Sequence, residues 1–458
     1  MLDTQTITSF AAQLRGRLVQ PADTDFDSTR QVYNAMIDRR PQLIVQCRDV
    51  ADVVQGVRFA GEQALLLAVR GGGHNGGGLG TCDGGLVLDL AGLDGIRVDA
   101  EARTVRVEGG CTWAAVDHAT HAFGLAVPSG IIGSTGVGGL TLGGGIGHLT
   151  RKHGLSVDNL LEADVVLADG SLVTANASHH PDLYWALRGG GGNFGVVTSF
   201  LFQAHPVDMV VAGPTFWPLA DAGRVLRWYA DFMATAPEDL NGFFAFLSIP
   251  PVEPYPAALH GMKVCGVVWC WTGAIADAEA ALQPAAEFGP PMVHAPQPMP
   301  FPMLQGAFDA LYPKGHQWYW RADFVNSLPD AAIAEHLRHA AEMPTPQSTM
   351  HLYPIDGAAH RVAAADTPFS YRTSRWAQVM VGVSPDPADA PRITEWTKQY
   401  WDALHPYSAG GAYVNMMMDE GPDRVRASYQ GNYERLVAVK RRYDPGNLFR
   451  VNQNIRPD

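Results

Sequence analysis

A single histidine, His74, lies inside a glycine-dense stretch near the start of the chain, VRGGGHNGGGLG at residues 69–80. The apolar run at residues 65–69 predicts a strand that leads into this loop. Because glycine takes positive φ at little cost, such a loop can turn several main-chain N–H groups toward one anion. The stretch therefore predicts a cradle for a flat, phosphate-bearing cofactor, with His74 as the reactive side chain within it.

A nicotinamide-binding loop is the alternative, since Gly71, Gly73 and Gly76 satisfy the spacing G-x-G-x-x-G. That kind of loop must open directly into a helix whose first N–H groups receive the diphosphate. Here the glycines continue to Gly80, and a second strand-like run follows at residues 86–90. The pattern is therefore weak evidence for a nicotinamide site.

Three further motifs extend the pattern over nearly the whole chain. A second glycine-rich stretch, SGIIGSTGVGGLTLGGGIGHLTRKHG, occupies residues 129–154 and is followed by LSVDN. RGGGGNFGVVT lies at residues 188–198, and YDPGNLFRVNQNI lies at residues 443–455. Together with RGGGHN at residues 70–75, these motifs resemble the berberine-bridge-enzyme-like branch of the vanillyl-alcohol-oxidase flavoproteins, and within it the small bacterial oxidases of the 6-hydroxy-D-nicotine oxidase type.

The resemblance implies an α+β fold with a PCMH-type FAD-binding domain and an antiparallel-sheet substrate domain covered by helices. In that family the histidine of the first loop is bonded to the 8α-methyl group of FAD, and the match gives this role to His74. An uncharged imidazole nitrogen is a competent nucleophile toward that methyl group when a rigid loop holds it in place. The alternative is a loop histidine that only forms a hydrogen bond nearby.

Many relatives attach FAD a second time, through the cysteine of a G-x-C-P-x-x-G motif. Counting back from Gly143 puts Ile132 at that position, and isoleucine has no nucleophile. Cys111 is the nearest cysteine in sequence, but it begins a helix-like segment at residues 111–120 and is interpreted as structural. We therefore expect a single covalent bond to FAD and no cysteinyl link.

The resemblance also assigns residues to the cofactor site. Asn452, Gln453 and Asn454 match a C-terminal stretch that hydrogen-bonds the flavin or its ribityl chain; the alternative is a plain polar tail. Main-chain N–H groups of residues 133–139 are candidates to stabilise negative charge on the reduced flavin. The expected FAD contacts are Arg70, Gly71, Gly72, Gly73, His74, Asn75, Gly78, Gly133, Ser134, Thr135, Gly138, Gly139, Gly143, Gly144, Gly147, Asn159, Val197, Tyr413, Asn415, Asn452 and Gln453.

Four residues are candidates for roles in catalysis. His148 directly follows a glycine run, and an unperturbed histidine suits proton transfer, although a histidine in such a position is as often structural. Tyr413 and Tyr371 are the other candidates for a base, but a phenol needs a lowered pKa or a neighbouring acceptor. Thr135 matches the position that controls oxygen access in relatives, where a small side chain favours an oxidase over a dehydrogenase.

The composition of the chain disfavours several classes of partner and indicates its compartment. Its 458 residues are 47% hydrophobic, and 33 basic against 46 acidic side chains give a net charge of −13, which disfavours nucleic acid or an anionic membrane as a partner. The five cysteines show no metal spacing, so we expect no metal site and a reduced compartment. The N-terminus has no secretory pattern and no apolar run is long enough for a bilayer, so we expect a cytoplasmic protein, as a monomer or a dimer.

Alternating patterns organise the motifs into three segments. Residues 49–63 show helical spacing, residues 433–443 predict another helix, and residues 96–107 and 163–175 each predict a hairpin. Pro206 marks a boundary after a closing strand. We expect an FAD-binding domain at residues 1–205, a substrate domain at residues 206–410, and a C-terminal segment at residues 411–458 that returns to the first domain.

Tryptophans concentrate in the second segment, which holds nine of the eleven in the chain. Trp269 and Trp271 are two residues apart, as are Trp318 and Trp320, so each pair projects from one face of a predicted strand. Such faces either pack against helices or form the wall of a pocket for a planar substrate. Both interpretations remain open for each pair.

The resemblance implies hydride transfer from a substrate C–H bond to flavin N5, followed by reoxidation by dioxygen with release of hydrogen peroxide. We expect a small hydrophobic or ring-containing substrate: an amine, an alcohol or a phenolic compound. Two alternatives remain. One is a dehydrogenase of the same fold with a non-oxygen acceptor, and the other is a flavin-containing binding protein without turnover.

Overall fold

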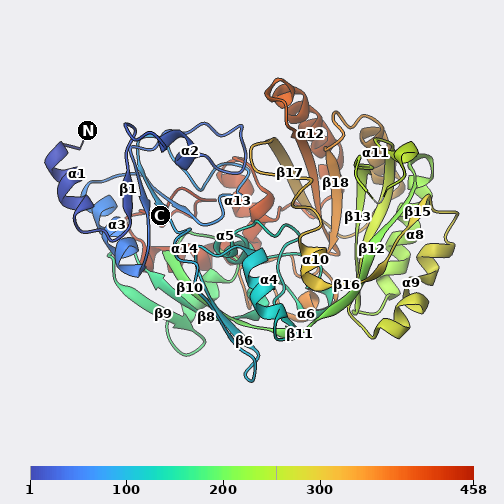
Figure 1. Cartoon of the computed structure of the whole chain (residues 1–458), viewed down its shortest axis with the longest axis horizontal. Helices are drawn as coiled ribbons and strands as arrows, with labels where there is room; N and C mark the ends of the chain where they lie inside the picture. The colour runs from blue at the N-terminus through green and yellow to red at the C-terminus, as the bar shows by residue number, and fades with distance from the viewer. Residues whose placement is uncertain (1, 254) are drawn as a thin grey trace.

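The computed structural model describes residues 2–253 and 255–458, and it contains two large regions side by side (Figure 1). The N-terminal half forms one region from two small sheets and their helices, and a single large sheet forms most of the other. The C-terminus lies in the first region, on the same side as the N-terminus (Figure 1). The expected α+β fold is confirmed.

A four-stranded sheet supports the first glycine loop. Its strands run in the order β1 (Arg17–Val19), β2 (Leu43–Gln46), β4 (Leu86–Asp89) and β3 (Leu67–Arg70). Helix α3 (Val50–Glu62) is capped by the Asp49 carboxylate and buries Val53, Val57 and Ala60 against the sheet, as its helical spacing predicts. Strands β3 and β4 are parallel, so the glycine loop leaves the carboxyl edge of this sheet.

A five-stranded antiparallel sheet follows, in the order β5 (Ile96–Asp99), β6 (Thr104–Glu108), β10 (Val196–Gln203), β8 (Leu160–Val166) and β9 (Leu172–Asn176). Both expected hairpins are confirmed, since β5 pairs with β6 and β8 pairs with β9. Helix α4 (Trp113–His121) buries Trp113 and Val116 in the core against this sheet. Cys111 is buried beside them, in agreement with a structural role.

The second region is built on an eight-stranded antiparallel sheet. Seven strands form the order β15 (Val293–His294), β12 (Met209–Pro218), β14 (Lys263–Trp271), β13 (Leu240–Ser248), β18 (Thr349–Pro354), β19 (Trp376–Ser384) and β17 (Gln317–Val325), and β16 (Gln297–Pro300) also pairs with β12. Side chains alternate between the two faces of such strands. One face therefore packs on helices while the other is turned toward the first region.

Four helices cover the outer face of this sheet: α8 (Ala222–Thr235), α9 (Ala278–Glu287), α11 (Asp330–Ala341) and α12 (Ala390–Leu404). Trp269 is fully buried there, with its ring 5.9 Å from that of Phe232 and 6.4 Å from that of Trp228, both on α8. For Trp269 the helix-packing interpretation therefore holds. The same core contains Trp271, Trp376 and Trp396.

The C-terminal segment returns to the first region through α13 (Pro422–Tyr429) and α14 (Tyr433–Tyr443), the second with the expected bounds. Lys440 of α14 is buried, and its Nζ donates to Asp444 at 2.6 Å and to the carbonyls of Asn193 and Phe449 at 2.7 and 2.8 Å. A buried ammonium is stable only with such partners. The hydrogen bond from Lys440 to Asn193 attaches α14 to the glycine-rich turn that contains Asn193.

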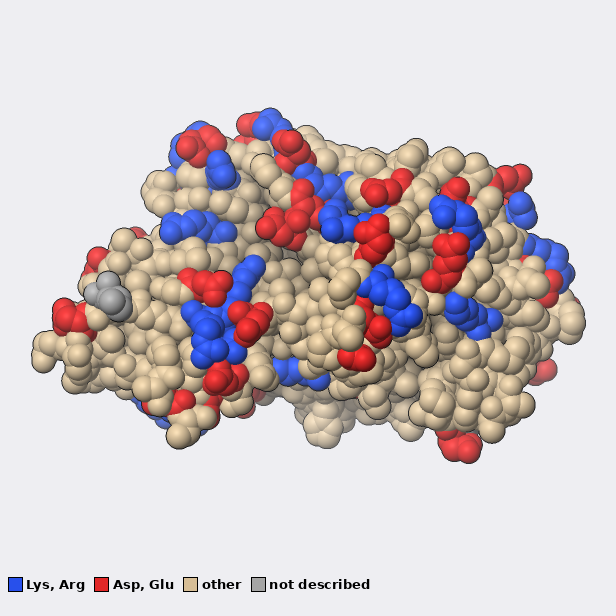
Figure 2. All heavy atoms as spheres, turned by 90° about the horizontal axis from the view of Figure 1, so that it is seen from above, with Lys and Arg blue, Asp and Glu red and all other residues tan. Residues whose placement is uncertain are grey.

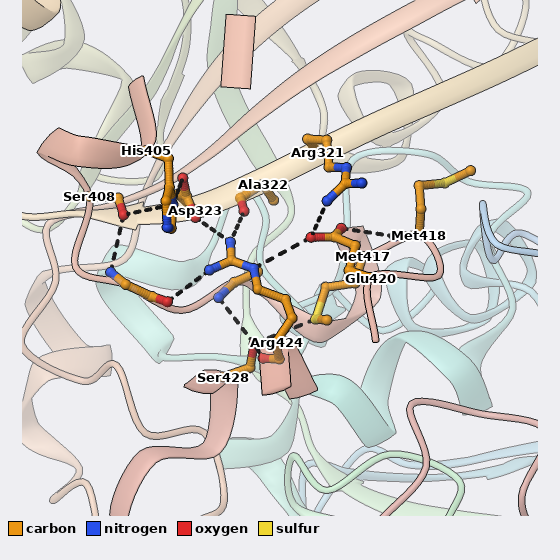
Figure 3. A network of polar contacts seen from close by, with 12 residues as sticks. Arg321, Ala322, Asp323, His405, Ser408, Met417, Met418, Glu420, Arg424 and Ser428 are labelled. Carbon is orange, nitrogen blue, oxygen red and sulfur yellow. Dashed lines mark hydrogen bonds and ion pairs between the residues drawn. The ribbon is translucent and has the colours of Figure 1, made fainter. Parts of the chain in front are cut away.

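A buried charge network attaches the C-terminal segment to β17 (Figure 3). Arg424 of α13 pairs with Asp323 of β17 and with Glu420, and donates to the carbonyl of Ala322 at 2.8 Å. Arg321 lies 2.8 Å from Glu420. The two carboxylates are 0% and 1% exposed, so their charges depend on these guanidinium partners.

The division at residues 205 and 410 stays a prediction. The first boundary falls inside β11 (His205–Pro206), which pairs with β7 (Leu125–Ala126) of the first region.

On the face drawn in Figure 2, Lys and Arg side chains are interspersed with Asp and Glu. Among the helices of the described residues, none combines the length and the apolar composition that crossing a bilayer requires.

Candidate cofactor and substrate site

A cavity of about 350 Å³ lies between the two regions, with a floor of glycine loops and a wall of strands. The wall follows the two-residue period of three neighbouring strands, because alternate residues face the same side. Its members are Trp318, Trp320 and Ala322 of β17, Thr349, His351 and Tyr353 of β18, and Ala377, Val379 and Val381 of β19. The substrate-region sheet thus closes over a site that the first region supports.

The two glycine loops of the floor touch each other through their main chains. A Cβ atom on Gly72 would lie 2.3 Å from the nitrogen of Gly136, and a Cβ on Gly136 would lie 2.2 Å from the nitrogen of Gly72. No other residue type fits at either position without moving a main chain. The glycines are therefore needed for the approach of the loops, as well as for the positive φ of 69° at Gly73.

Unpaired main-chain donors line the first loop. In the part of the chain that the structure describes, the N–H groups of Gly71 through Asn75 have no hydrogen-bond acceptor. Gly139 and Gly192 also line the cavity, and a Cβ at either position would meet no atom within 4 Å. A row of free donors beside open glycine positions fits a large anionic cofactor that approaches the bare main chain.

Arg70 adds a positive charge to this donor row. Its Nη2 atom is 2.8 Å from Asp89, whereas its buried Nη1 atom has no partner within the described protein. An unpaired buried guanidinium nitrogen is costly unless a ligand accepts from it. The geometry therefore fits an anion at this point. Among the described residues that line the cavity, Arg70 is the only one with a formal charge.

His74 is held on the cavity by two contacts. Its ring stacks on Tyr33, with centroids 3.9 Å apart and planes at 21°, and its Nε2 atom lies 3.1 Å from the Ser134 hydroxyl. Loss of solvent lowers the pKa of His74 to about 4; a hydrogen bond to the Ser134 main chain opposes this shift, and the positive charge of Lys314 adds to it. The imidazole is therefore neutral at physiological pH, which a nucleophilic nitrogen requires.

Most of the expected FAD contacts line the cavity. They are Arg70, Gly71, Gly72, Gly73, His74, Asn75, Thr135, Gly138, Gly139, Val197, Tyr413, Asn415, Asn452 and Gln453. At the C-terminal end, Asn452 donates to the carbonyl of Gly192 at 3.1 Å and Gln453 donates to that of Met418 at 3.1 Å. Asn452 therefore joins the C-terminal segment to the floor, whereas Gln453 connects two parts of that segment to each other.

Seven expected contacts lie behind the lining: Gly78, Gly133, Ser134, Gly143, Gly144, Gly147 and Asn159. Gly143 and Gly144 make room for the side chains of Asn415 and Tyr413, since their Cβ atoms would lie 2.1 and 3.1 Å from those residues. Asn159 is used by its own turn, where it donates to the carbonyls of two neighbouring residues and contacts His205. Ser134, Gly143 and Gly144 thus contact or make room for residues that line the cavity, whereas Asn159 does not contact the lining.

Tyr413 lies at the edge of the cavity with a fixed hydroxyl. It accepts hydrogen bonds of 2.8 Å from the Gly145 N–H and from the Asn415 amide. Burial raises the pKa of Tyr413 to about 12, because the two hydrogen bonds only partly offset the loss of solvent. Tyr413 is thus a neutral phenol at physiological pH and can act as a hydrogen-bond donor rather than a base.

The other two candidates for a base do not line the cavity. His148 is fully buried behind Phe243, at a ring distance of 6.0 Å, and both of its nitrogens lack a partner in the described chain. Tyr371 donates to the carbonyl of Ala427 at 2.9 Å and stacks on Phe324. Phe243 separates His148 from the wall, so sequence proximity to the glycine run did not bring its ring into the cavity.

Several lining side chains were missed by the sequence analysis. Tyr33, Phe308, Tyr312, His351 and Tyr353 all reach the cavity, from segments without a glycine motif. One signal was available in the strand-like run at residues 349–354. Its alternate residues Thr349, His351 and Tyr353 are polar, which places three polar side chains on one strand face. The tryptophans divide between the two interpretations, since Trp318 and Trp320 line the cavity whereas the other pair does not.

The described residues contain no group of three histidine, cysteine or carboxylate side chains placed to hold a metal ion.

Comparisons with known proteins agree with a flavin site. Residues 41–176 match the family described as "FAD binding domain", and residues 412–456 match "Berberine and berberine like". The first match contains both glycine loops, and the second contains Tyr413, Asn415, Asn452 and Gln453.

Full-length relatives extend this match. The chain is 32% identical to an FAD-linked oxidoreductase of Dictyostelium discoideum over 457 residues, 99% of this chain and 97% of the relative. It is 28% identical to (R)-6-hydroxynicotine oxidase of Paenarthrobacter nicotinovorans over 461 residues, 97% of each chain. The solved structure of 6-hydroxy-D-nicotine oxidase from Arthrobacter nicotinovorans superposes with a TM-score of 0.87 at 25% identity and covers 100% of both chains. The chain therefore belongs to the berberine-bridge-enzyme-like family of FAD-linked oxidoreductases.

Proposed function

We propose that this oxidoreductase is an oxidase that carries FAD through one covalent bond, from His74 to the 8α-methyl group, and that dioxygen is its electron acceptor. The observation that carries the proposal is a neutral, half-buried imidazole on the cavity, between unpaired N–H groups of its own loop and Ser134 of the second loop. A nucleophile held this rigidly beside a bound ring needs little further activation.

When bound, FAD supplies the redox chemistry: hydride leaves a substrate C–H bond for the flavin, and dioxygen takes up the two electrons and leaves as hydrogen peroxide. The residues of the chain bind and orient. Arg70 and the free N–H groups of residues 71–75 would bind the diphosphate. The Tyr413 hydroxyl, held by the Asn415 amide, would donate a hydrogen bond at the flavin edge. Thr135 leaves room for dioxygen with its small side chain.

A single attachment point is supported by the side chains around the cavity. Ile132 lines it at the position where relatives carry a second, cysteinyl link. All five cysteines are buried, and among the described lining residues none is a cysteine. Burial also raises the pKa of the Cys111 thiol to about 11, so little thiolate exists at neutral pH. We assign the attachment to His74 because it lies on the glycine loop beside Ser134, whereas His351, the other lining histidine, lies on β18 of the wall.

The substrate is a small ring-containing or otherwise hydrophobic metabolite. Support comes from the aromatic wall, in which Tyr312, Trp318 and Trp320 face the cavity. A relative of similar length is named for oxidation of a hydroxynicotine, a ring compound. Flat aromatic side chains bind flat substrates by stacking. A dehydrogenase with a quinone or dye as acceptor is the remaining alternative.

The covalent bond is tested by denaturing gel electrophoresis viewed for flavin fluorescence. The wild-type band should fluoresce, and His74→Ala should lose the fluorescence while it keeps yellow, dissociable FAD before denaturation. His179→Ala, a change at an exposed histidine, is the matched control and should stay fluorescent. A dark wild-type band removes the covalent attachment.

The electron acceptor is tested by anaerobic reduction followed by air. An oxidase bleaches with its substrate and recovers its yellow colour in air within seconds, with one hydrogen peroxide per flavin. A dehydrogenase stays bleached in air and recovers with a quinone. Reduction with dithionite allows the same experiment before a substrate is known.

A further inference from the structure

The wall contains a hydrogen-bonded pair of side chains that lies outside the glycine motifs. His351 and Tyr353 are two residues apart on β18 and therefore face the same side of the sheet. The Nδ1 atom of His351 is 2.5 Å from the Tyr353 hydroxyl, and both side chains line the cavity. Phe243 packs on both rings, at 5.2 Å from each, so the pair is held from behind.

This pair is electrically neutral. Burial lowers the pKa of His351 to about 3 and raises the pKa of the Tyr353 phenol, so neither group ionises near physiological pH. No Asp, Glu or Lys lies among the described lining residues, and Arg70 lies on the floor, where its free Nη1 is assigned to the cofactor diphosphate. The wall therefore offers hydrogen bonds to a ligand and no counter-ion.

A second hydrogen-bonded His–Tyr pair, on the helices that cover the sheet, provides a comparison for His351 and Tyr353. His336 and Tyr400 lie 2.7 Å apart, between α11 and α12, and both are 0% exposed. Nε2 of His336 is sealed in the core without a partner. The chemistry of the two pairs is the same, but only His351 and Tyr353 reach the cavity.

We propose that His351 and Tyr353 recognise an uncharged oxygen group of the substrate, so that the enzyme selects a neutral ring-containing alcohol or phenol over an amine that is charged at neutral pH or a carboxylate. The proposal rests on the proposed oxidase function and names the substrate class of the same cavity. In an alcohol, loss of hydride from carbon and of the hydroxyl proton gives a carbonyl group, while dioxygen receives both electrons and both protons as hydrogen peroxide.

The physical reason is the different requirement of each ligand group. A hydroxyl group both donates and accepts, and the neutral imidazole can match either role at Nε2. Nε2 carries the ring proton when the phenol donates to Nδ1, and Nε2 is an acceptor when Nδ1 carries the proton and donates to the phenol oxygen. An ammonium or a carboxylate must leave water for a site without an opposite charge, which costs far more than one hydrogen bond returns. The neutral pair therefore discriminates by charge as well as by shape.

The test is the binding of three probes of one size to the holoprotein at pH 7: benzyl alcohol, protonated benzylamine and benzoate. Dissociation constants come from the change in flavin absorbance under anaerobic conditions, so no turnover is needed. We expect benzyl alcohol to bind at least about tenfold more tightly than either ion, since an unpaired charge outweighs a neutral hydrogen bond. Equal or tighter binding of benzylamine, or no binding of benzyl alcohol, overturns the proposal.

Variants test whether the preference for benzyl alcohol depends on His351 and Tyr353. His351→Phe and Tyr353→Phe should each weaken benzyl alcohol binding about 3- to 10-fold, the range for one hydrogen bond. His351→Glu should reverse the preference toward benzylamine, because it supplies the missing counter-ion. His336→Phe and Tyr400→Phe are the matched controls and should leave the ratio of the three constants unchanged.

The outcomes separate this proposal from the proposed function. A colourless protein contradicts the FAD assignment and both proposals with it. A yellow protein whose denatured band is dark contradicts only the covalent bond, and its dissociable FAD still reports the binding of the probes. A yellow, covalently flavinylated protein that does not distinguish alcohol from amine overturns only the role of His351 and Tyr353. If Tyr353→Phe and Tyr400→Phe change alcohol binding equally, the effect is structural and the proposal also fails.

Discussion

The floor and the wall of the cavity use different chemistry. The floor is main chain: Gly72 and Gly136 approach through their backbones, and a row of N–H groups faces the cavity. The wall is side chain: Trp318, His351 and Val379 come from three strands and meet only because β18 and β19 pair in the correct register. The proposed cofactor site therefore depends largely on main-chain groups and glycines, whereas the wall depends on the identity and register of side chains.

The wall depends on the buried charges behind it, and breaking them should have the largest effect. Arg424→Met removes the guanidinium shared by the buried carboxylates of Asp323 and Glu420 and leaves each with one partner, His405 and Arg321 respectively. It also removes a bond to Ala322, which lines the cavity. We expect a loss of about 3–5 kcal/mol of unfolding free energy, measured by denaturant titration. Arg426→Met is the control, since its pair with Glu434 is exposed and contributes about 1 kcal/mol or less. Equal losses in both variants would show that the wall does not depend on this network.

The floor was predictable from sequence because its chemistry requires glycine. A strand, a run of glycines and His74 are contiguous, so local patterns were enough to place the loop at the edge of β3. Ser134 was also expected near the cofactor, and it does contact His74. The small sheets and their hairpins followed in the same way, from short-range alternation.

The wall could not be predicted, because it depends on contacts between distant residues. Nothing local distinguishes Trp318, which lines the cavity, from Trp269, which packs on α8. Both alternate correctly on a strand, and only the position of the strand in the sheet decides which face is covered by helices. The same limit applies to His148 and His351: the first followed a glycine run and is sealed, and the second had no motif and faces the cavity.

The contact between the two loops tests the floor directly. In Gly136→Ala the new methyl group would lie 2.2 Å from the nitrogen of Gly72, so the loops must separate. We expect a loss of about 1–3 kcal/mol in unfolding free energy together with loss of gel fluorescence from bound flavin. Gly61→Ala on α3 is the matched control, because a Cβ there meets nothing within 4 Å. A Gly136→Ala protein with normal stability and flavin content would mean that the loops need not touch.

His148 tests whether a residue of the second glycine stretch takes part in the chemistry of the wall. Its two buried nitrogens have no partner among the described residues, and burial lowers its pKa to about 3. His148→Leu removes this cost, so we expect about 1 kcal/mol more stability at pH 7 with unchanged turnover.

The pH dependence of the same variant has a defined sign. The pKa of His148 is lowered on folding, so protonation near pH 5 favours the unfolded wild-type chain; stability is full above about 6.5 and declines below it. The advantage of His148→Leu should therefore grow as the pH falls from 7 to 5, as followed by urea titration. A loss of turnover with intact stability would instead give His148 a catalytic role.

The smallest effect concerns His74, whose reactivity depends on its neutral form. With the pKa lowered to about 4 by burial, the imidazole is already uncharged at pH 6, and a further rise in pH adds almost no neutral form. The rate of FAD attachment to flavin-free protein, followed by gel fluorescence, should therefore change less than about twofold between pH 6 and pH 8. An exposed histidine with a pKa near 6.5 would instead gain about fourfold in neutral fraction over that interval. A steep increase would show that the loop leaves His74 in water until FAD binds, so that the floor is completed only by its ligand.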